Sequence, residues 1–73
     1  MNQYKGYFEH NAIIRKISGR NVRFNILIGN TETDMEICIA AKDTKILDDC
    51  IRHIGKKIKL VIGNGKIVKV ITN

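Results

Sequence analysis

The sequence contains no proline and no tryptophan, and its only cysteines are Cys38 and Cys50. Two thiols are too few for the disulfide framework that a secreted domain of 73 residues usually carries. No stretch rich in serine and glycine interrupts the chain, so no flexible linker is expected. We therefore predict one folded domain over residues 1–73, with both thiols reduced.

Long apolar runs are also missing, and none approaches the roughly 18 consecutive residues that a membrane-spanning helix requires. The first residues, MNQYKGYFEHN, are polar and lack the apolar stretch of a signal peptide. These absences argue against a membrane partner and predict a cytoplasmic protein.

Isoleucine is abundant instead, with 14 isoleucines against three leucines. Its β-branched side chain packs well on a pleated surface, so this composition favours a mainly β fold. A chain of 73 residues can form only a single hydrophobic core.

The charge is unevenly distributed along the chain, which has 13 lysines and arginines, 7 aspartates and glutamates, and a formal net charge of +6. Residues 1–30 hold five bases and one acid, residues 31–54 hold three bases and six acids, and residues 55–73 hold five bases and no acid. The two ends are thus basic and the middle is acidic. An excess of positive charge favours a polyanionic partner such as nucleic acid.

The apolar pattern in the first half of the chain predicts three strands, over residues 12–18, 22–28 and 35–40. A turn at SGRN joins the first two, and a polar loop over residues 29–34 joins the second to the third. In the second strand, alternation places Val22, Phe24, Ile26 and Ile28 on the buried face. The residues expected in the core are Phe24, Ile26, Ile37, Ile39 and Leu60.

After residue 43 the period changes to that of a helix, predicted over residues 44–54. Asp43 or Thr44 is suited to cap its start, and Gly55 its end. The apolar helix face comprises Ile46, Leu47, Cys50, Ile51 and Ile54. Two further strands, over residues 58–62 and 66–71, are joined by GNGK, a turn sequence that accepts positive φ.

The order of these elements is that of the OB-fold, a five-stranded Greek-key barrel with one helix between strands 3 and 4. Over residues 12–72, the passage VRFNILIGN, MEICIAAKD and ILDDCIRHIGKKIKLVIGNGKIVKV resembles the OB-fold nucleic-acid-binding domains of the single-strand-binding and replication-protein type. The resemblance implies non-catalytic binding of single-stranded DNA or RNA. It places the ligand across strands 2 and 3 and on the loops that join strands 1 to 2 and 4 to 5.

Basic residues occupy those loops and the strands beside them. Tyr4, Tyr7 and Phe8 are the only aromatic residues left for stacking on bases, because Phe24 is expected in the core. Phosphate contacts should then supply most of the affinity, with little sequence preference. The predicted nucleic-acid-binding residues are Arg15, Arg20, Arg23, Asn25, Lys59, Lys66, Lys69 and Tyr7.

No pattern in the sequence supports catalysis or a cofactor. Asp48 and Asp49 are adjacent on the predicted helix and diverge by about 100°, as on a solvated face. The sequence GNG lacks the spacing of a phosphate-binding loop and precedes a strand. The four possible zinc ligands, of which no two form a C-x-x-C pair, are His10, Cys38, Cys50 and His53. We expect no enzyme activity, no metal and no cofactor.

The alternative interpretation is a protein-interaction or inhibitor module, for example an accessory protein of a phage or mobile element. The acidic middle of the chain and the small number of aromatic residues favour this alternative, whereas the basic loops favour nucleic acid.

Overall fold

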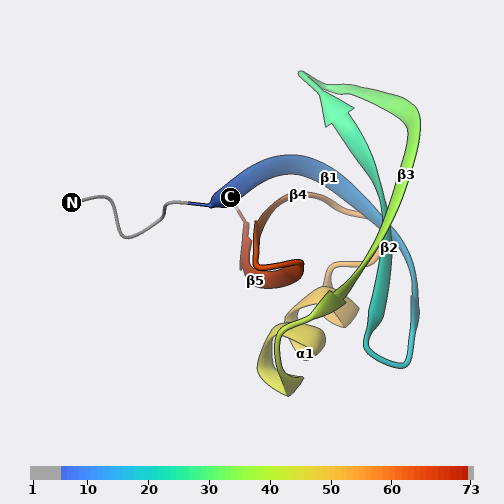
Figure 1. The fold of residues 1–73 in the computed structure, drawn as a ribbon. Coiled ribbons are helices and arrows are strands. Elements are labelled where there is room, and N and C mark those ends of the chain that lie inside the picture. The colour runs from blue at the N-terminus through green and yellow to red at the C-terminus, as the bar shows by residue number, and fades with distance from the viewer. Residues whose placement is uncertain (1–5, 73) are drawn as a thin grey trace.

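A computed structural model describes residues 6–72 as five strands and one helix (Figure 1). The elements are β1 (Tyr7–Ser18), β2 (Asn21–Ile28), β3 (Thr31–Ala41), α1 (Thr44–Arg52), β4 (Lys57–Gly63) and β5 (Lys66–Ile71). The prediction of a mainly β fold with one helix between the third and fourth strands is confirmed. In the part of the chain that the structure describes, no helix is long and apolar enough to span a membrane.

The five strands form one sheet that closes into a ring in the order β1, β2, β3, β5, β4. All neighbours are antiparallel except β3 and β5, which run parallel over two residue pairs. The ring closes because β1 is long enough to pair with β2 through its second half and with β4 through residues 7–13. β1 therefore begins at Tyr7, and the predicted start at residue 12 is wrong.

The strands are strongly staggered around the ring, as tilted strands must be in a closed sheet. The register leads from Ser18 at one end of β1 to Tyr7 at its other end, a shift of 11 residues (18 − 7). The positions on this path are, in order, Ser18, Asn21, Ala40, Lys66, Gly63 and Tyr7.

The interior of the ring is filled by apolar side chains, of which Phe24 and Leu60 are completely buried, as predicted. Ile26 is also buried, with 9% of its surface exposed. Ile37 and Ile39 are only half-buried at the rim of this core, so their predicted burial is wrong. The reason is that β3 pairs with β5 only at Ala40 and Ala41, and most of β3 extends past the ring (Figure 1).

The hydrophobic core ends at Ile26 on β2, two residues before the end of the strand. Ile28 is 70% exposed, whereas Leu27 is 6% exposed, so the predicted burial of Ile28 is wrong. The register of β2 against β3 jumps between Asn25 and Leu27, which is a β-bulge. Two residues of β2 face four of β3 there, an even difference, so the two faces of β2 are not exchanged. Leu27 is buried outside the core that contains Ile26, and Ile28 lies beyond the end of that core. The predicted loop over residues 29–34 is also shorter, because β3 already begins at Thr31 after a two-residue turn.

The helix α1 covers one end of the ring (Figure 1). The Oδ1 atom of Asp43 accepts a hydrogen bond of 2.9 Å from the backbone N–H of Ile46, so Asp43 is the N-cap. The helix ends at Arg52, two residues earlier than predicted. Gly55 has a φ of +82° and its N–H donates to the carbonyl of Ile14 at 2.8 Å, which ties the chain back to β1.

Only part of the predicted apolar helix face is buried. Cys50 is completely buried, and Ile46 and Leu47 pack partly against the core. Ile51 and Ile54 remain 48% and 44% exposed. Ile51 lies in the last turn of α1, and Ile54 follows the end of the helix.

The two thiols should differ sharply in reactivity. Cys50 is buried and Cys38 is exposed on β3. Burial, with a smaller contribution from the Asp49 carboxylate, raises the pKa of the Cys50 thiol to about 11. Because the thiolate is the reactive form, iodoacetamide near pH 8 should modify Cys38 alone in the folded protein and both thiols after unfolding. Mass spectrometry counts the adducts, and rapid double labelling of the folded protein would contradict the packing of α1 on the ring.

Candidate nucleic-acid interface

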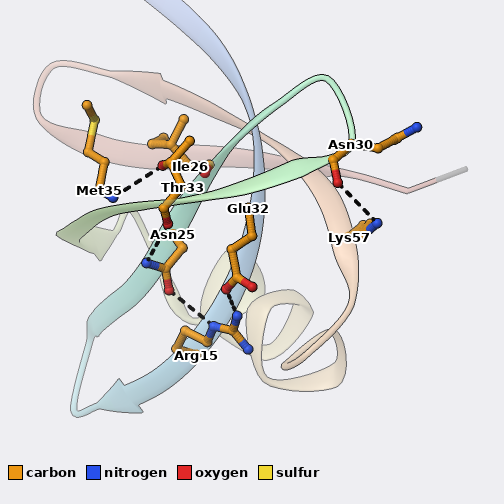
Figure 2. A network of polar contacts seen from close by, with 8 residues as sticks. All are labelled: Arg15, Asn25, Ile26, Asn30, Glu32, Thr33, Met35 and Lys57. Carbon is orange, nitrogen blue, oxygen red and sulfur yellow. Dashed lines mark hydrogen bonds and ion pairs between the residues drawn. The ribbon is translucent and has the colours of Figure 1, made fainter.

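The outer face of β2 and β3, across which the resemblance places a ligand, continues onto β1. Its two arginines, Arg15 and Arg23, are paired with acids, whereas Lys16 has no ion pair among the described residues. Arg15 forms an ion pair with Glu32, and its Nε donates a hydrogen bond of 3.1 Å to Oδ1 of Asn25 (Figure 2). The amide nitrogen of Asn25 donates in turn to the carbonyl of Thr33 at 3.3 Å. Arg15 and Asn25 thus hold the bulged β3 against β2, and both are already engaged.

Arg23 on the same face is paired as well, since its Nε lies 3.6 Å from Oε1 of Glu36. Exposed pairs of this kind are individually weak, but each carboxylate cancels a positive charge that a phosphate would otherwise meet. A shallow depression of about 110 Å³ lies on this face, lined by Lys16, Ser18, Asn21, Arg23 and Cys38. The face therefore offers a small hollow with little net positive charge.

A second face is formed by the first half of β1, by β4 and by β5. In the register, Tyr7 lies opposite Gly63, which lies opposite Lys66. Two residues further along β1, Glu9 lies opposite Val61, which lies opposite Lys69. The central strand carries small side chains in these rows and the flanking strands carry large ones, so the surface is concave.

This concave surface is a groove of about 480 Å³, the size of a small-ligand site. Val61, Val68 and Ile71 supply its apolar surface, and the remaining residues that line it are Tyr7, Glu9, Lys42 and Lys69. The ring of Tyr7 lies directly against Gly63, because a Cβ atom at that position would come within 2.5 Å of Cδ1 and Cε1. Glycine at position 63 is therefore what lets the aromatic ring lie across β4.

Three basic residues lie near the junction of the β1–β2 turn, the end of β3 and the start of β5, and one of them, Lys42, also lines the groove. The carbonyl of Arg20 accepts a hydrogen bond of 2.9 Å from the N–H of Ala41. The N–H of Lys42 donates to the carbonyl of Ile67, also at 2.9 Å, and Lys66 pairs with Ala40 in the sheet. Backbone hydrogen bonds thus bring Arg20, Lys42 and Lys66 into one neighbourhood.

We call Arg20, Lys42, Lys66 and Lys69 the basic cluster. All four are exposed, and none has a carboxylate within ion-pair distance among residues 6–72. The Nζ atom of Lys59, by contrast, lies 3.5 Å from Oε1 of Glu9. Four cations without an ion pair in the described chain therefore lie at or near the groove, whereas Arg15 and Arg23 on the outer face of β1, β2 and β3 are paired.

The predicted site residues fall into two groups in the structure. Tyr7 and Lys69 line the groove, and Lys66 lies across β4 from Tyr7 in the register. Arg20 lies at the neighbouring junction with β3, and Lys59 is ion-paired with Glu9 of the groove. Arg15, Arg23 and Asn25 lie on the other face and are engaged with acidic or backbone groups. Of the aromatic residues, Phe8 is 62% exposed, and Tyr4 lies outside the described residues.

Sequence reasoning missed Lys42 and Glu9 as members of the site. Both depend on long-range pairing, since Lys42 reaches β5 through its backbone and Glu9 reaches β4 through the early start of β1. The alternation of Tyr7, Glu9 and Asn11 with Phe8 and His10 is the local signal that could have extended the strand.

Comparison of the chain with protein-family models, curated proteins and solved structures finds no match in any of the three.

Proposed function

We propose that this protein is a non-catalytic, cytoplasmic binder of single-stranded DNA or RNA, and that the bound strand follows the groove between β1 and β5. The observation that carries the proposal is the basic cluster beside a groove that contains an aromatic ring; none of its four cations has an ion pair within residues 6–72. Single-strand-binding surfaces combine these two features, a positive track for phosphates and an aromatic surface for bases.

The finer fold assignment belongs to the same proposal. We assign the ring to the OB-fold, a Greek-key barrel, on the order of its strands and on the helix between β3 and β4. The loops that flank the ligand in that fold correspond here to the β1–β2 turn with Arg20 and the β4–β5 turn before Lys66.

The proposed path differs from the one that the resemblance implied. On the outer face of β2 and β3, a phosphate would compete with Glu32 and Glu36 for Arg15 and Arg23. At the basic cluster no such competitor is present among the described residues, so counterion release can contribute to binding in full. Among the described residues that line the groove Tyr7 is the one aromatic, so most of the affinity should come from phosphates and should be modest.

Fluorescence anisotropy tests this proposal directly. Labelled 12-nucleotide single strands of DNA and RNA, and a DNA duplex of the same length, are titrated at low and moderate salt. Single strands should bind more tightly than the duplex, and the logarithm of the binding constant should fall linearly with that of the salt concentration. Equally weak binding to all three ligands, unaffected by salt, would refute the proposal.

A protein-interaction module is the second candidate, and exposed apolar side chains favour it. Ile28 is 70% exposed and Met35 59% exposed, both on the part of β2 and β3 that extends past the ring. Such side chains are common at protein interfaces. This candidate would take precedence if the anisotropy titrations showed no binding to nucleic acid.

A further inference from the structure

The two long sides of the groove differ in chemistry. Lys69 of β5 and Lys42 beside it form a cationic side, whereas Tyr7 and Glu9 of β1 form an aromatic and acidic side. Val61 of β4, 8% exposed, separates Glu9 from Lys69 in the register. A strand with phosphates on one edge and bases on the other matches this asymmetry in one orientation only.

That orientation places the phosphates along β5 and the bases toward β1. A phosphate beside Glu9 would be repelled by the carboxylate, whereas one beside Lys69 would be attracted. Glu9 is itself 57% exposed in its side chain, and Lys59 holds it at a long 3.5 Å. A weak exposed pair of this kind leaves the carboxylate able to accept hydrogen bonds from a base.

The residues on the β1 side also restrict which base fits. Tyr7, fixed against Gly63, offers a surface on which a base can stack, and Glu9 lies two residues further along the same strand face. An ionised carboxylate only accepts hydrogen bonds. Guanine presents two adjacent donors, N1–H and N2–H, that match the two carboxylate oxygens, whereas each of the other bases presents a single donor position.

We infer that the groove contains a subsite for one base, stacked on Tyr7 and read by Glu9, and that this subsite prefers guanine. The inference rests on the proposed function, because it assumes that a single strand occupies the groove. It departs from the low sequence preference expected from the sequence alone.

Oligonucleotides that differ at one position test this inference. Anisotropy is measured on hexathymidylates in which one central base is replaced by guanine, hypoxanthine, adenine or cytosine. The guanine oligonucleotide should bind about tenfold more tightly than the adenine or cytosine one, as expected for a bidentate contact. Hypoxanthine keeps N1–H but lacks the N2 amino group, so it should rank between them.

Glu9→Gln should remove the preference for guanine while keeping or raising general affinity, because it deletes a negative charge next to the phosphates. The matched control is Glu36→Gln, which also deletes a carboxylate that is ion-paired, in this case with Arg23, but which lies on the other face. This control should keep the tenfold preference. Equal binding of all four oligonucleotides, or a preference that survives in Glu9→Gln, would overturn the subsite and leave the proposed function standing. Failure of every single strand to bind would instead overturn the proposed function itself.

Discussion

Replacing Phe24 with alanine is expected to lower the free energy of unfolding by about 3 to 5 kcal/mol. Phe24 is completely buried and is the largest of the fully buried side chains. Alanine would leave a cavity that the surrounding strands cannot fill, because they are tied to one another around the ring. A domain of this size has a total stability of only about 5 to 15 kcal/mol, so the variant should be close to unfolding.

Urea denaturation followed by circular dichroism measures this effect. The matched control is Phe8→Ala, since Phe8 is 62% exposed and its loss should change stability by less than about 1 kcal/mol. If Phe24→Ala unfolded at the same urea concentration as the parent but lost affinity for nucleic acid, Phe24 would be a binding residue and the packing of the ring would be wrong.

Simultaneous replacement of Lys42, Lys66 and Lys69 by alanine should reduce affinity for single-stranded nucleic acid by roughly a hundredfold at 0.1 M salt. Each phosphate contact to a single strand contributes about 0.7 to the slope of log binding constant against log salt, so three contacts contribute about 2. The slope of the triple variant should therefore be shallower by about 2, and its affinity should approach that of the parent near 1 M salt.

The control for this variant is the triple replacement of Lys16, Lys45 and Lys56, which are exposed, lie outside the groove and have no ion-pair partner in the described chain. It lowers the net charge by the same three units and tests whether charge alone explains the loss. The slope of log binding constant against log salt should change by less than half as much in this control as in the Lys42, Lys66 and Lys69 variant. Equal losses in the two triple variants would show that binding depends on overall charge and that no path follows the groove.

Local sequence patterns predict the elements of this fold because each strand and the helix carries its own period. The alternation around Phe24, the change to helical spacing after Asp43 and the glycine-rich turn before Lys66 are all local signals. The errors in predicted burial arise where the pairing of strands, rather than the local spacing of apolar residues, decides which side chains are covered. Two extra residues of β3 lie between the partners of Asn25 and Leu27, and no count of alternating residues in β2 shows where its partner strand inserts them.

The candidate site is predictable only in part, for a related reason. Composition places positive charge at both ends of the chain, and the resemblance to OB-fold domains predicts Lys66 and Lys69 as contacts at the loop between the last two strands. Which basic side chains remain available to a phosphate depends on which carboxylates lie beside them in the sheet. Arg15 and Glu32 are 17 residues apart (32 − 15), and only the register of β1, β2 and β3 brings them together (Figure 2).

The location of the binding path is tested most directly by amide chemical shifts in a ¹H–¹⁵N correlation spectrum, recorded while a hexathymidylate with one central guanine is added. The groove predicts the largest shifts at Tyr7, Glu9 and Val61, at Lys42, and from Lys66 to Lys69. Shifts concentrated instead at Arg23, Asn25 and Cys38, with the groove unchanged, would place the strand on the outer face of β2 and β3 and contradict the proposed path.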